Sequence, residues 1–263
     1  MPQSSKKTRD RHLAKLYERR RRERHRKRRQ RVVAASVGIL VALGGVGGGL
    51  FLLTKGGKAK PQASGSPSAS PTVGVACGGS VPAAAAEKKP SYQKAPKMTV
   101  DPRKTYTATM VTSCGTIEFE LDPKLAPNTV NSFVFLVRKH FYDGLIFHRI
   151  ARDFVIQGGD PTGTGSSGPG YKTVDAPPKG STYPLGTVAM AKGGNEPAGT
   201  AGSQFFIMIA KNSSLTPDYA IIGNVVKGQD VADKIGALPI QSNAADGKPV
   251  QTVYIVQVTI KVS

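Results

Sequence analysis

The sequence predicts a mostly β fold: an eight-stranded closed β-barrel capped by two helices, preceded by one transmembrane helix and a disordered linker. Three observations support this expectation. Residues 32–53 form a run of 22 residues without a charge, and residues 54–98 are rich in Pro, Ala, Ser and Gly. From residue 99 onward, short stretches of alternating apolar and polar residues are separated by turn residues. We therefore divide the chain into a tail at 1–31, a span at 32–53, a linker at 54–98 and a folded domain at 99–263.

The tail carries most of the excess positive charge. The chain has 37 Lys+Arg and 17 Asp+Glu, a net charge of +20; residues 1–31 contribute +12 and residues 101–263 only +2. Positive charge accumulates on the cytoplasmic side of a membrane span, so we expect a cytoplasmic N-terminus and an extracytoplasmic domain. The nearly neutral domain argues against a nucleic-acid partner. We expect the tail to set the topology and to bind anionic lipid.

The uncharged run is long enough to cross a bilayer as a helix. At about 1.5 Å per residue it would extend roughly 33 Å, about the thickness of the hydrocarbon core. A cleaved signal peptide is the competing interpretation, but the run is followed by Thr54-Lys55-Gly56 rather than by an Ala-x-Ala site. The sequence therefore favours an uncleaved single-pass anchor in the cell membrane and leaves cleavage open.

The linker contains one of the two cysteines, Cys77; the other, Cys114, lies at a predicted turn. The linker has too few apolar residues to order itself by burial, which predicts disorder. An extracytoplasmic location permits a disulfide between Cys77 and Cys114. The sequence leaves open whether they are bridged or free thiols; a bridge would order part of the linker.

The domain from residue 99 contains eight strand candidates and two helix candidates. Pro127 begins the first helix, and the apolar residues Val130, Phe133, Val134 and Val137 form one stripe along it. Eight short strands with two helices favour a capped barrel. The strands are expected at 106–112, 116–121, 145–150, 154–158, 186–191, 204–209, 220–226 and 250–262, and the helices at 127–140 and 228–235.

The last strand, 250–262, has an unusual apolar pattern. One face is predicted to be buried throughout, and the opposite face, with Val253 and Ile255, only near the start of the strand. The residues of the first face are Tyr254, Val256, Val258, Ile260 and Val262.

Three sequence blocks in this domain, in order and with matching gaps, resemble the cyclophilin-type peptidyl-prolyl cis–trans isomerases. The first, residues 147–160, reads FHRIARDFVIQGGD; the second combines Met190-Ala191 with GSQFFI at 202–207; the third, residues 222–228, reads IGNVVKG. The resemblance covers residues 101–263. It implies a cyclophilin-like eight-stranded barrel closed by two helices, and isomerisation of X–Pro bonds. Combined with the expected membrane anchor, it leads us to expect unfolded or exported proteins outside the cytoplasmic membrane as substrates.

The resemblance also implies roles for individual residues. Arg149 would be catalytic, donating a hydrogen bond to the prolyl nitrogen as the amide twists, and Gln157 would orient Arg149. An always-charged guanidinium with a fixed fork of donors suits this task. The positions implied to bind substrate are His148, Phe154, Val155, Ala191, Gln204, Phe206, Leu215 and Tyr219.

Three residues depart from the family pattern: Lys192, Ser214 and Tyr219 stand where an Asn, a Trp and a His are frequent. These departures put substrate preference in doubt rather than catalysis. We expect no cofactor and no metal, because the four histidines are scattered. We expect proline-containing polypeptides as partners and a monomer. The rival hypothesis is a non-catalytic proline-peptide-binding chaperone module on a membrane tether.

Overall fold

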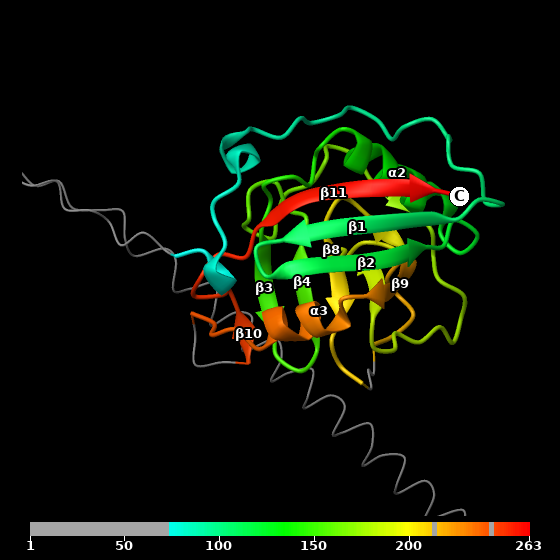
Figure 1. Ribbon diagram of the computed structural model, residues 1–263. Helices are drawn as coiled ribbons and strands as arrows, with labels where there is room; N and C mark the ends of the chain where they lie inside the picture. The colour runs from blue at the N-terminus through cyan, green and yellow to red at the C-terminus, as the bar shows by residue number, and fades with distance from the viewer. Residues whose placement is uncertain (1–73, 212–214, 242–244) are drawn as a thin grey trace, which may run out of the picture. The chain divides into compact units, whose positions relative to one another are not determined.

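The computed structural model of the chain describes residues 74–211, 215–241 and 245–263 (Figure 1). The expected tail at 1–31, the expected span at 32–53, the first part of the linker and Ser214 lie outside these residues. Within the described ranges, no helix combines the length and the apolar character needed to cross a membrane.

The described residues form one large antiparallel sheet and one small sheet. The large sheet has nine strands in the order β10-β3-β4-β8-β6-β9-β2-β1-β11, and β5 pairs with β7 in the small one. The strands are β1 Tyr106–Thr112, β2 Gly115–Leu121, β3 Phe147–Ala151, β4 Val155–Gly158, β5 Thr173–Val174, β6 Thr187–Met190, β7 Thr200–Ala201, β8 Phe205–Met208, β9 Ile221–Lys227, β10 Asp246–Gly247 and β11 Ile255–Val262. The sequence did not predict β5, β7 and β10, because two residues are too few to show an alternating pattern.

The large sheet is curled, and its β11 edge returns to the chain just before β3 (Figure 1). Ile146 forms an isolated antiparallel bridge with Tyr254. The backbone N–H of Ile255 donates to Leu145 O at 2.7 Å, and that of Phe147 donates to Val253 O at 3.0 Å. The expected closed barrel of eight strands is therefore corrected to a curled half-barrel, because a continuous ladder does not join β11 to β3 in the described chain.

Two helices pack against the curled sheet, as predicted. The first, α2 (Pro127–Arg138), packs against β11 and β5; the second, α3 (Gln229–Gly236), packs against β2, β3 and β4. All four residues of the predicted apolar stripe of α2 are buried. The stripe therefore faces the core, and α2 ends at Arg138, two residues before the predicted end.

The start of β11 differs from the prediction. The register between β1 and β11 skips Val256, because Val111 pairs with Gln257 while Thr112 pairs with Ile255. Such a bulge reverses the faces of the residues that follow it. Ile255 and Val258 are therefore both buried. The predicted burial of the opposite face near the start of the strand, at Val253 and Ile255, is confirmed, but the predicted burial of the first face throughout is wrong, and of its members only Val258 is buried. Its other members are half-buried or exposed: Tyr254, Val256, Ile260 and Val262.

Phe205 and Phe206, adjacent on β8, point into two different apolar clusters. Phe205 is in the main core, where its ring lies 5.9 Å from Tyr142 and 5.8 Å from Phe147 between centroids. Phe206 belongs to a smaller cluster on the opposite face, together with Tyr183. The alternation of side chains along a strand thus separates a structural aromatic residue from one available to a site.

The disordered linker predicted at 54–98 is wrong for residues 74–98, which we call the strap. The strap contains two short 3-10 helices, η1 (Ala76–Gly78) and η2 (Ala83–Ala86), and then runs along the domain as extended chain (Figure 1). Ala76 is fully buried, and its N–H donates to Thr252 O at 2.9 Å. A low content of apolar side chains does not exclude order here, because backbone hydrogen bonds, a disulfide and ring contacts hold the strap.

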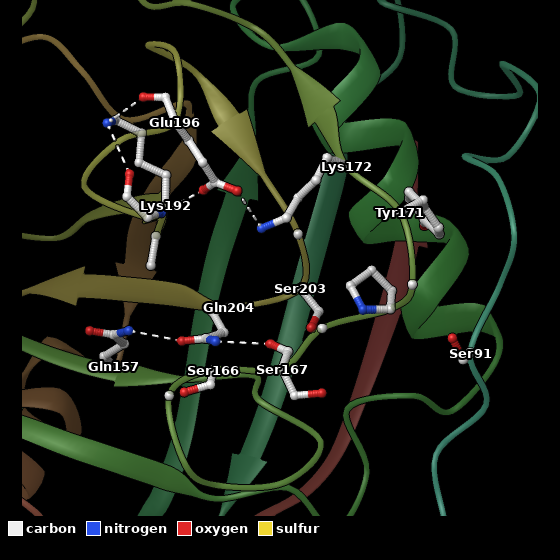
Figure 2. Close-up of a pocket in the computed structure, with 17 residues that line it drawn as sticks. Ser91, Gln157, Ser166, Ser167, Tyr171, Lys172, Lys192, Glu196, Ser203 and Gln204 are labelled. Atoms are coloured by element: carbon white, nitrogen blue, oxygen red, sulfur yellow. Dashed lines mark hydrogen bonds and ion pairs between the residues drawn. The ribbon is translucent and has the colours of Figure 1, made fainter.

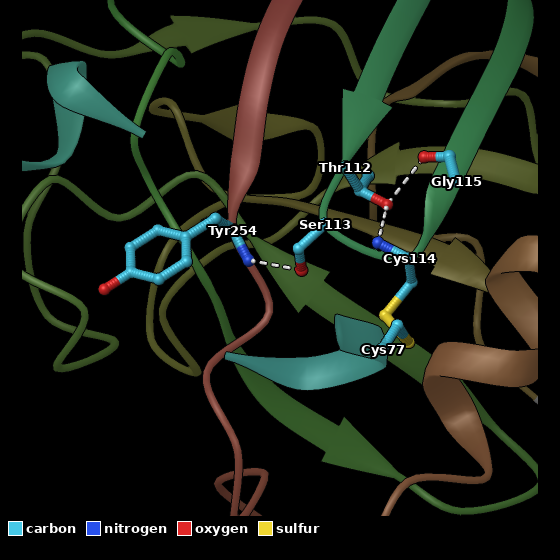
Figure 3. Close-up of a disulfide and its surroundings, with 6 residues drawn as sticks. All are labelled: Cys77, Thr112, Ser113, Cys114, Gly115 and Tyr254. Carbon is cyan, nitrogen blue, oxygen red and sulfur yellow. Dashed lines mark hydrogen bonds between the residues drawn. A yellow bond between two sulfur atoms is a disulfide. The ribbon is translucent and has the colours of Figure 1, made fainter. Parts of the chain in front are cut away.

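A disulfide between Cys77 and Cys114 joins the strap to the β1–β2 turn (Figure 3). The two Cα atoms lie 5.0 Å apart. Thr112 fixes the turn, because its hydroxyl accepts from the N–H of Cys114 at 3.1 Å and donates to Gly115 O at 2.7 Å. The question that the sequence left open is answered in favour of the bridge, with part of the linker ordered.

Candidate active site

A small cavity of about 130 Å³ lies on the face of β3, β4 and β8 opposite the main core. Strand pairing explains why its residues meet. Arg149 on β3 pairs with Gln157 on β4, and Gln157 pairs with Phe206 on β8, so three neighbouring strands present one row. The cavity is lined by Arg149, Phe154, Val155, Gln157, Ala191, Lys192, Phe206, Leu215 and Tyr219.

A chain of hydrogen bonds holds the polar side of the cavity. Arg149 Nη1 donates to Gln157 Oε1 at 2.9 Å, and Gln157 Nε2 donates to Gln204 Oε1 at 3.0 Å. Gln204 Nε2 in turn donates to the backbone oxygen of Ser167 at 2.9 Å. Each amide accepts on one side and donates on the other, so the chain fixes both amide orientations and one edge of the guanidinium. Gln157 thus has the position that the resemblance implied.

Asp246 holds the other edge of the guanidinium, and the sequence analysis missed it. Arg149 Nε donates to Asp246 Oδ1 at 2.8 Å, and Arg149 Nη2 donates to Asp246 Oδ2 at 2.5 Å. Asp246 comes from β10, which pairs with β3 through Ala151 and Ile150. The only local signal is an Asp-Gly pair that reads as a turn, so nothing in the sequence pointed to an ion pair across 97 positions.

Aromatic rings form the apolar side of the cavity. The rings of Phe206 and Tyr219 meet edge to face, with centroids 5.4 Å apart. Tyr183 supports both: its hydroxyl donates to Tyr219 O and accepts from the N–H of Tyr219, each at 2.9 Å. Burial raises the pKa of Tyr183, which keeps this hydroxyl protonated and able to donate. Sequence reasoning missed Tyr183, because it lies in a loop outside the three motif blocks.

Lys192 is unusually buried for a lysine, with 5% of its side chain exposed. Its ammonium group lies 3.1 Å from Asp218 Oδ2, donates to Glu196 O at 3.0 Å and stands 5.8 Å from the centre of the Tyr219 ring. Two of the three family departures therefore contact each other in the site. At the position where an Asn is frequent, this chain therefore places a lysine that is paired with Asp218 and borders the small cavity.

His148 does not line the cavity, contrary to the implied role. It is the extra residue of a bulge, since Phe147 pairs with Gly158 and Arg149 with Gln157. His148 is 5% exposed, and neither ring nitrogen has a hydrogen-bond partner in the described structure. Burial lowers the pKa of His148, although the nearby charge of Asp160 acts in the opposite direction.

Asp160 organises the loop that follows β4. Burial alone would raise its pKa, but several donors outweigh burial and the pKa is lowered. Its carboxylate accepts from the N–H of Thr162 at 2.7 Å, from the hydroxyl of Thr162 at 2.8 Å and from the N–H of Ser167 at 3.2 Å. The carboxylate thus fixes the loop whose Ser167 carbonyl receives Gln204.

A larger cavity of about 620 Å³ adjoins the small one (Figure 2). Gln157, Ala191 and Lys192 line both cavities, and Gln204 lines the larger one. Its remaining walls come from the loop at 165–172, from the segment at 193–203 and from Ser91 of the strap. A bound peptide in extended conformation, with one apolar side chain in the small cavity, can therefore continue into the larger cavity.

The arrangement suits the binding of a proline ring beside a hydrogen-bond donor. The small cavity offers aromatic surface on one side and a guanidinium on the other. Three of the five N–H groups of Arg149 are used by Gln157 and Asp246, which leaves one on each terminal nitrogen. No group of three or more His, Cys, Asp or Glu side chains that could hold a metal ion occurs among the described residues.

Comparisons with known proteins agree with this geometry. Residues 107–260 match the family described as "Cyclophilin type peptidyl-prolyl cis-trans isomerase/CLD". Peptidyl-prolyl cis-trans isomerase B of Streptomyces anulatus is 39% identical over 173 residues, which cover 59% of this chain and 95% of the relative. Peptidyl-prolyl cis-trans isomerase A of Mycobacterium tuberculosis is 38% identical over 182 residues, 62% of this chain and 96% of the relative.

A solved structure is similar as well. The cyclophilin type peptidyl-prolyl cis-trans isomerase of Cryptosporidium parvum, crystallised in the presence of the dipeptide Ala-Pro, is 30% identical and superimposes with a TM-score of 0.54. The match covers 59% of this chain and 98% of that structure. The match therefore extends over nearly the whole of the solved domain and over about three-fifths of this chain.

Proposed function

Because the chain belongs to the cyclophilin-type peptidyl-prolyl cis–trans isomerase family, we propose that it isomerises X–Pro bonds of unfolded or exported proteins outside the cytoplasmic membrane. The observation that carries the proposal is the Arg149 guanidinium, held by Gln157 and Asp246 at the edge of a cavity that has aromatic side chains on its other side. A structural relative crystallised in the presence of Ala-Pro supports a proline-containing substrate.

Cis–trans isomerisation breaks no covalent bond. Rotation about an X–Pro amide is slow because the C–N bond has partial double-bond character, with a barrier of about 18–20 kcal/mol. In the twisted transition state the prolyl nitrogen becomes pyramidal and gains a lone pair. A free N–H of Arg149 can donate to that lone pair while the apolar side chains hold the ring. The donor binds the twisted amide better than the planar one, and this difference is what accelerates the rotation.

Two features support an extracytoplasmic location. The disulfide between Cys77 and Cys114 is typical of proteins in oxidising compartments. The uncharged run at 32–53, preceded by the basic tail, favours a single-pass anchor with the domain outside. The proposed clients are therefore chains that emerge from the export machinery and refold near the membrane surface.

Catalysed refolding tests the proposed substrate class. We would measure the slow phase of refolding of a protein limited by proline isomerisation, with catalytic amounts of the full-length chain. We expect the slow phase to accelerate in proportion to enzyme concentration, and a protein without a proline-limited phase to be unaffected. A slow phase that stays unchanged while short X–Pro peptides are turned over would contradict unfolded proteins as substrates.

A further inference from the structure

The strap reaches the peptide site from outside the matched family domain. The domain match begins at residue 107, whereas Ser91 lines the larger cavity. In Figure 2 the strap passes beside the loop that carries Tyr171, with Ser91 facing that loop. The N–H of Tyr92 donates to Pro169 O at 2.8 Å. A segment that belongs to this chain and not to the common domain thus forms part of the cavity wall.

Tyr92 holds the loop against α2. Its ring meets Phe135 of α2 edge to face at 5.1 Å between centroids, and Tyr171 of the loop at 6.4 Å. Tyr171 is itself tied to α2, because its hydroxyl lies 2.9 Å from Ser132 Oγ. The loop is therefore clamped between the strap and a helix of the core.

The contact between strap and loop is too close for a side chain. Gly170 has a φ of +93°, and a Cβ at this position would lie 2.4 Å from Ser91 Oγ and 2.5 Å from Tyr92 O. A glycine is required here both for its backbone conformation and for the close approach. The loop thus approaches the strap more closely at Gly170 than a residue with a side chain would allow.

The strap is attached to the domain at several points. The disulfide anchors its beginning, and Lys89 in its middle, whose side chain is 3% exposed, donates to His140 O at 3.5 Å. At its end, Asn131 of α2 donates to Lys97 O at 3.0 Å. These anchors lie on both sides of Ser91 and Tyr92, so these two residues are held in place against the loop.

The clamped loop is connected to the catalytic residues. Ser167, two residues before Pro169, accepts the hydrogen bond from Gln204 that continues through Gln157 to Arg149. Only the larger cavity, however, has Ser91 in its wall. The strap is therefore placed to act on the part of a peptide beside the proline and not on the proline itself.

We propose that the strap is a specificity element of the peptide site, in which Ser91 and Tyr92 fix the wall of the larger cavity. This inference rests on the proposed function. An extended chain advances about 3.3–3.6 Å per residue, so a peptide with its proline in the small cavity brings neighbouring residues into the larger one. Longer substrates contact the wall that the strap builds, and the shortest substrates do not reach it.

The test compares two substrates with the same Ala-Pro bond, a blocked dipeptide and an octapeptide with Ala-Pro at its centre. For each full-length variant we would measure kcat and KM by isomerisation, and Kd by titration. Ser91→Trp narrows the larger cavity from an exposed position, and Val81→Trp is its matched control at a 60%-exposed strap residue that lines neither cavity. Tyr92→Ala removes the clamp, and Tyr92→Phe keeps the ring contacts.

We expect Tyr92→Ala, which loses the ring contacts of the clamp, to raise the octapeptide-to-dipeptide ratio of KM, and of Kd, by about threefold to tenfold, the range that corresponds to one aromatic contact. Ser91→Trp should raise the same ratio, because its indole fills part of the larger cavity. The octapeptide kcat should change less than its KM. Val81→Trp and Tyr92→Phe should keep the wild-type ratio. A ratio unchanged in Ser91→Trp, or raised equally by Val81→Trp, would overturn the inference.

The experiment distinguishes failure of the isomerase function from failure of the role assigned to the strap. If the wild type turns over neither peptide, the proposed function fails, but the Kd ratio still decides whether the strap shapes the site. If both peptides are turned over and the ratio does not respond, isomerase function stands and the strap has no role in specificity.

Discussion

The guanidinium of Arg149 has two side-chain partners, Gln157 and Asp246, which affect it in different ways. Gln157 connects it to the peptide-binding amides, whereas Asp246 neutralises part of its charge and occupies two of its N–H groups. The paired carboxylate prevents rotation of a long side chain that is 37% exposed. We interpret Asp246 as a positioning residue, because it acts on the substrate only through Arg149.

Removing Asp246 tests this interpretation. We expect Asp246→Ala to lower kcat/KM on an X–Pro peptide by about tenfold, because a donor displaced by about 1 Å loses much of its effect on the transition state. Asp246→Asn keeps one acceptor oxygen and should fall between the wild type and Asp246→Ala. Peptide isomerisation assays at fixed salt give the three values. A rate for Asp246→Ala equal to or above the wild type would show that the ion pair does not position Arg149.

We expect the buried His148 to make the free energy of unfolding depend on pH. Burial lowers the pKa of the folded His148 below its ordinary value of 6.5. Below that pH the unfolded chain binds a proton that the folded chain does not, so the free energy of unfolding should fall by up to about 1.4 kcal/mol per pH unit. The loss begins near pH 6.5 and continues down to the lowered pKa of the folded state.

Denaturant unfolding at pH 7.5 and 5.5 measures this effect. We expect His148→Gln to show a smaller fall between the two values than the wild type. His140→Gln is the control, because the side chain of His140 is 68% exposed. If His148→Gln loses as much stability on acidification as the wild type, the buried histidine is not the group responsible.

At the scale of the elements, regular patterns were predictable and exceptions to them were not. The alternation in residues 106–121 and the stripe of α2 match the structure, since one side of each element faces the core. The bulge at Val256 cannot be predicted from the alternation in 250–262, because the extra residue is set by pairing with β1. The strap was missed for a similar reason: its contacts are long-range and combine a disulfide, ring contacts and backbone hydrogen bonds.

The disulfide is expected to contribute to global stability through the strap. It closes a loop across a sequence separation of 37 residues, for which the chain-entropy estimate is about 4 kcal/mol. The double variant Cys77→Ser, Cys114→Ser should unfold at lower denaturant than the oxidised wild type, by up to that free energy. Reduced wild type serves as the second measurement. Identical unfolding midpoints for oxidised and reduced protein would refute a stabilising role.

For the whole molecule, the motif blocks identified both the family and most of the site. Of the ten predicted site residues, all except His148 and Gln204 line the small cavity, and Gln204 lines the larger one and is bound to Gln157. The residues not predicted, Asp246 and Tyr183, come from segments outside the motif blocks. Their roles arise only when the chain folds, because each contacts a site residue distant in sequence.

The orientation of the chain in the membrane is also a prediction about the whole molecule. We expect protease added to intact cells or spheroplasts to remove the domain at 99–263 and to leave residues 1–31 protected. The physical reason is the basic tail before the uncharged run at 32–53. Immunodetection of both ends of the chain would read out the result. If the domain is protected from protease until the membrane is lysed, the predicted orientation is wrong.

The central claim is that the guanidinium of Arg149 accelerates rotation about an X–Pro bond. The most direct measurement is kcat/KM of the full-length chain on an X–Pro peptide, for the wild type and Arg149→Ala, with unfolding curves to show that both are folded. A lost donor to the transition state costs on the order of 3 kcal/mol, so the account predicts a loss of about a hundredfold or more. Equal turnover by a folded Arg149→Ala protein would contradict it.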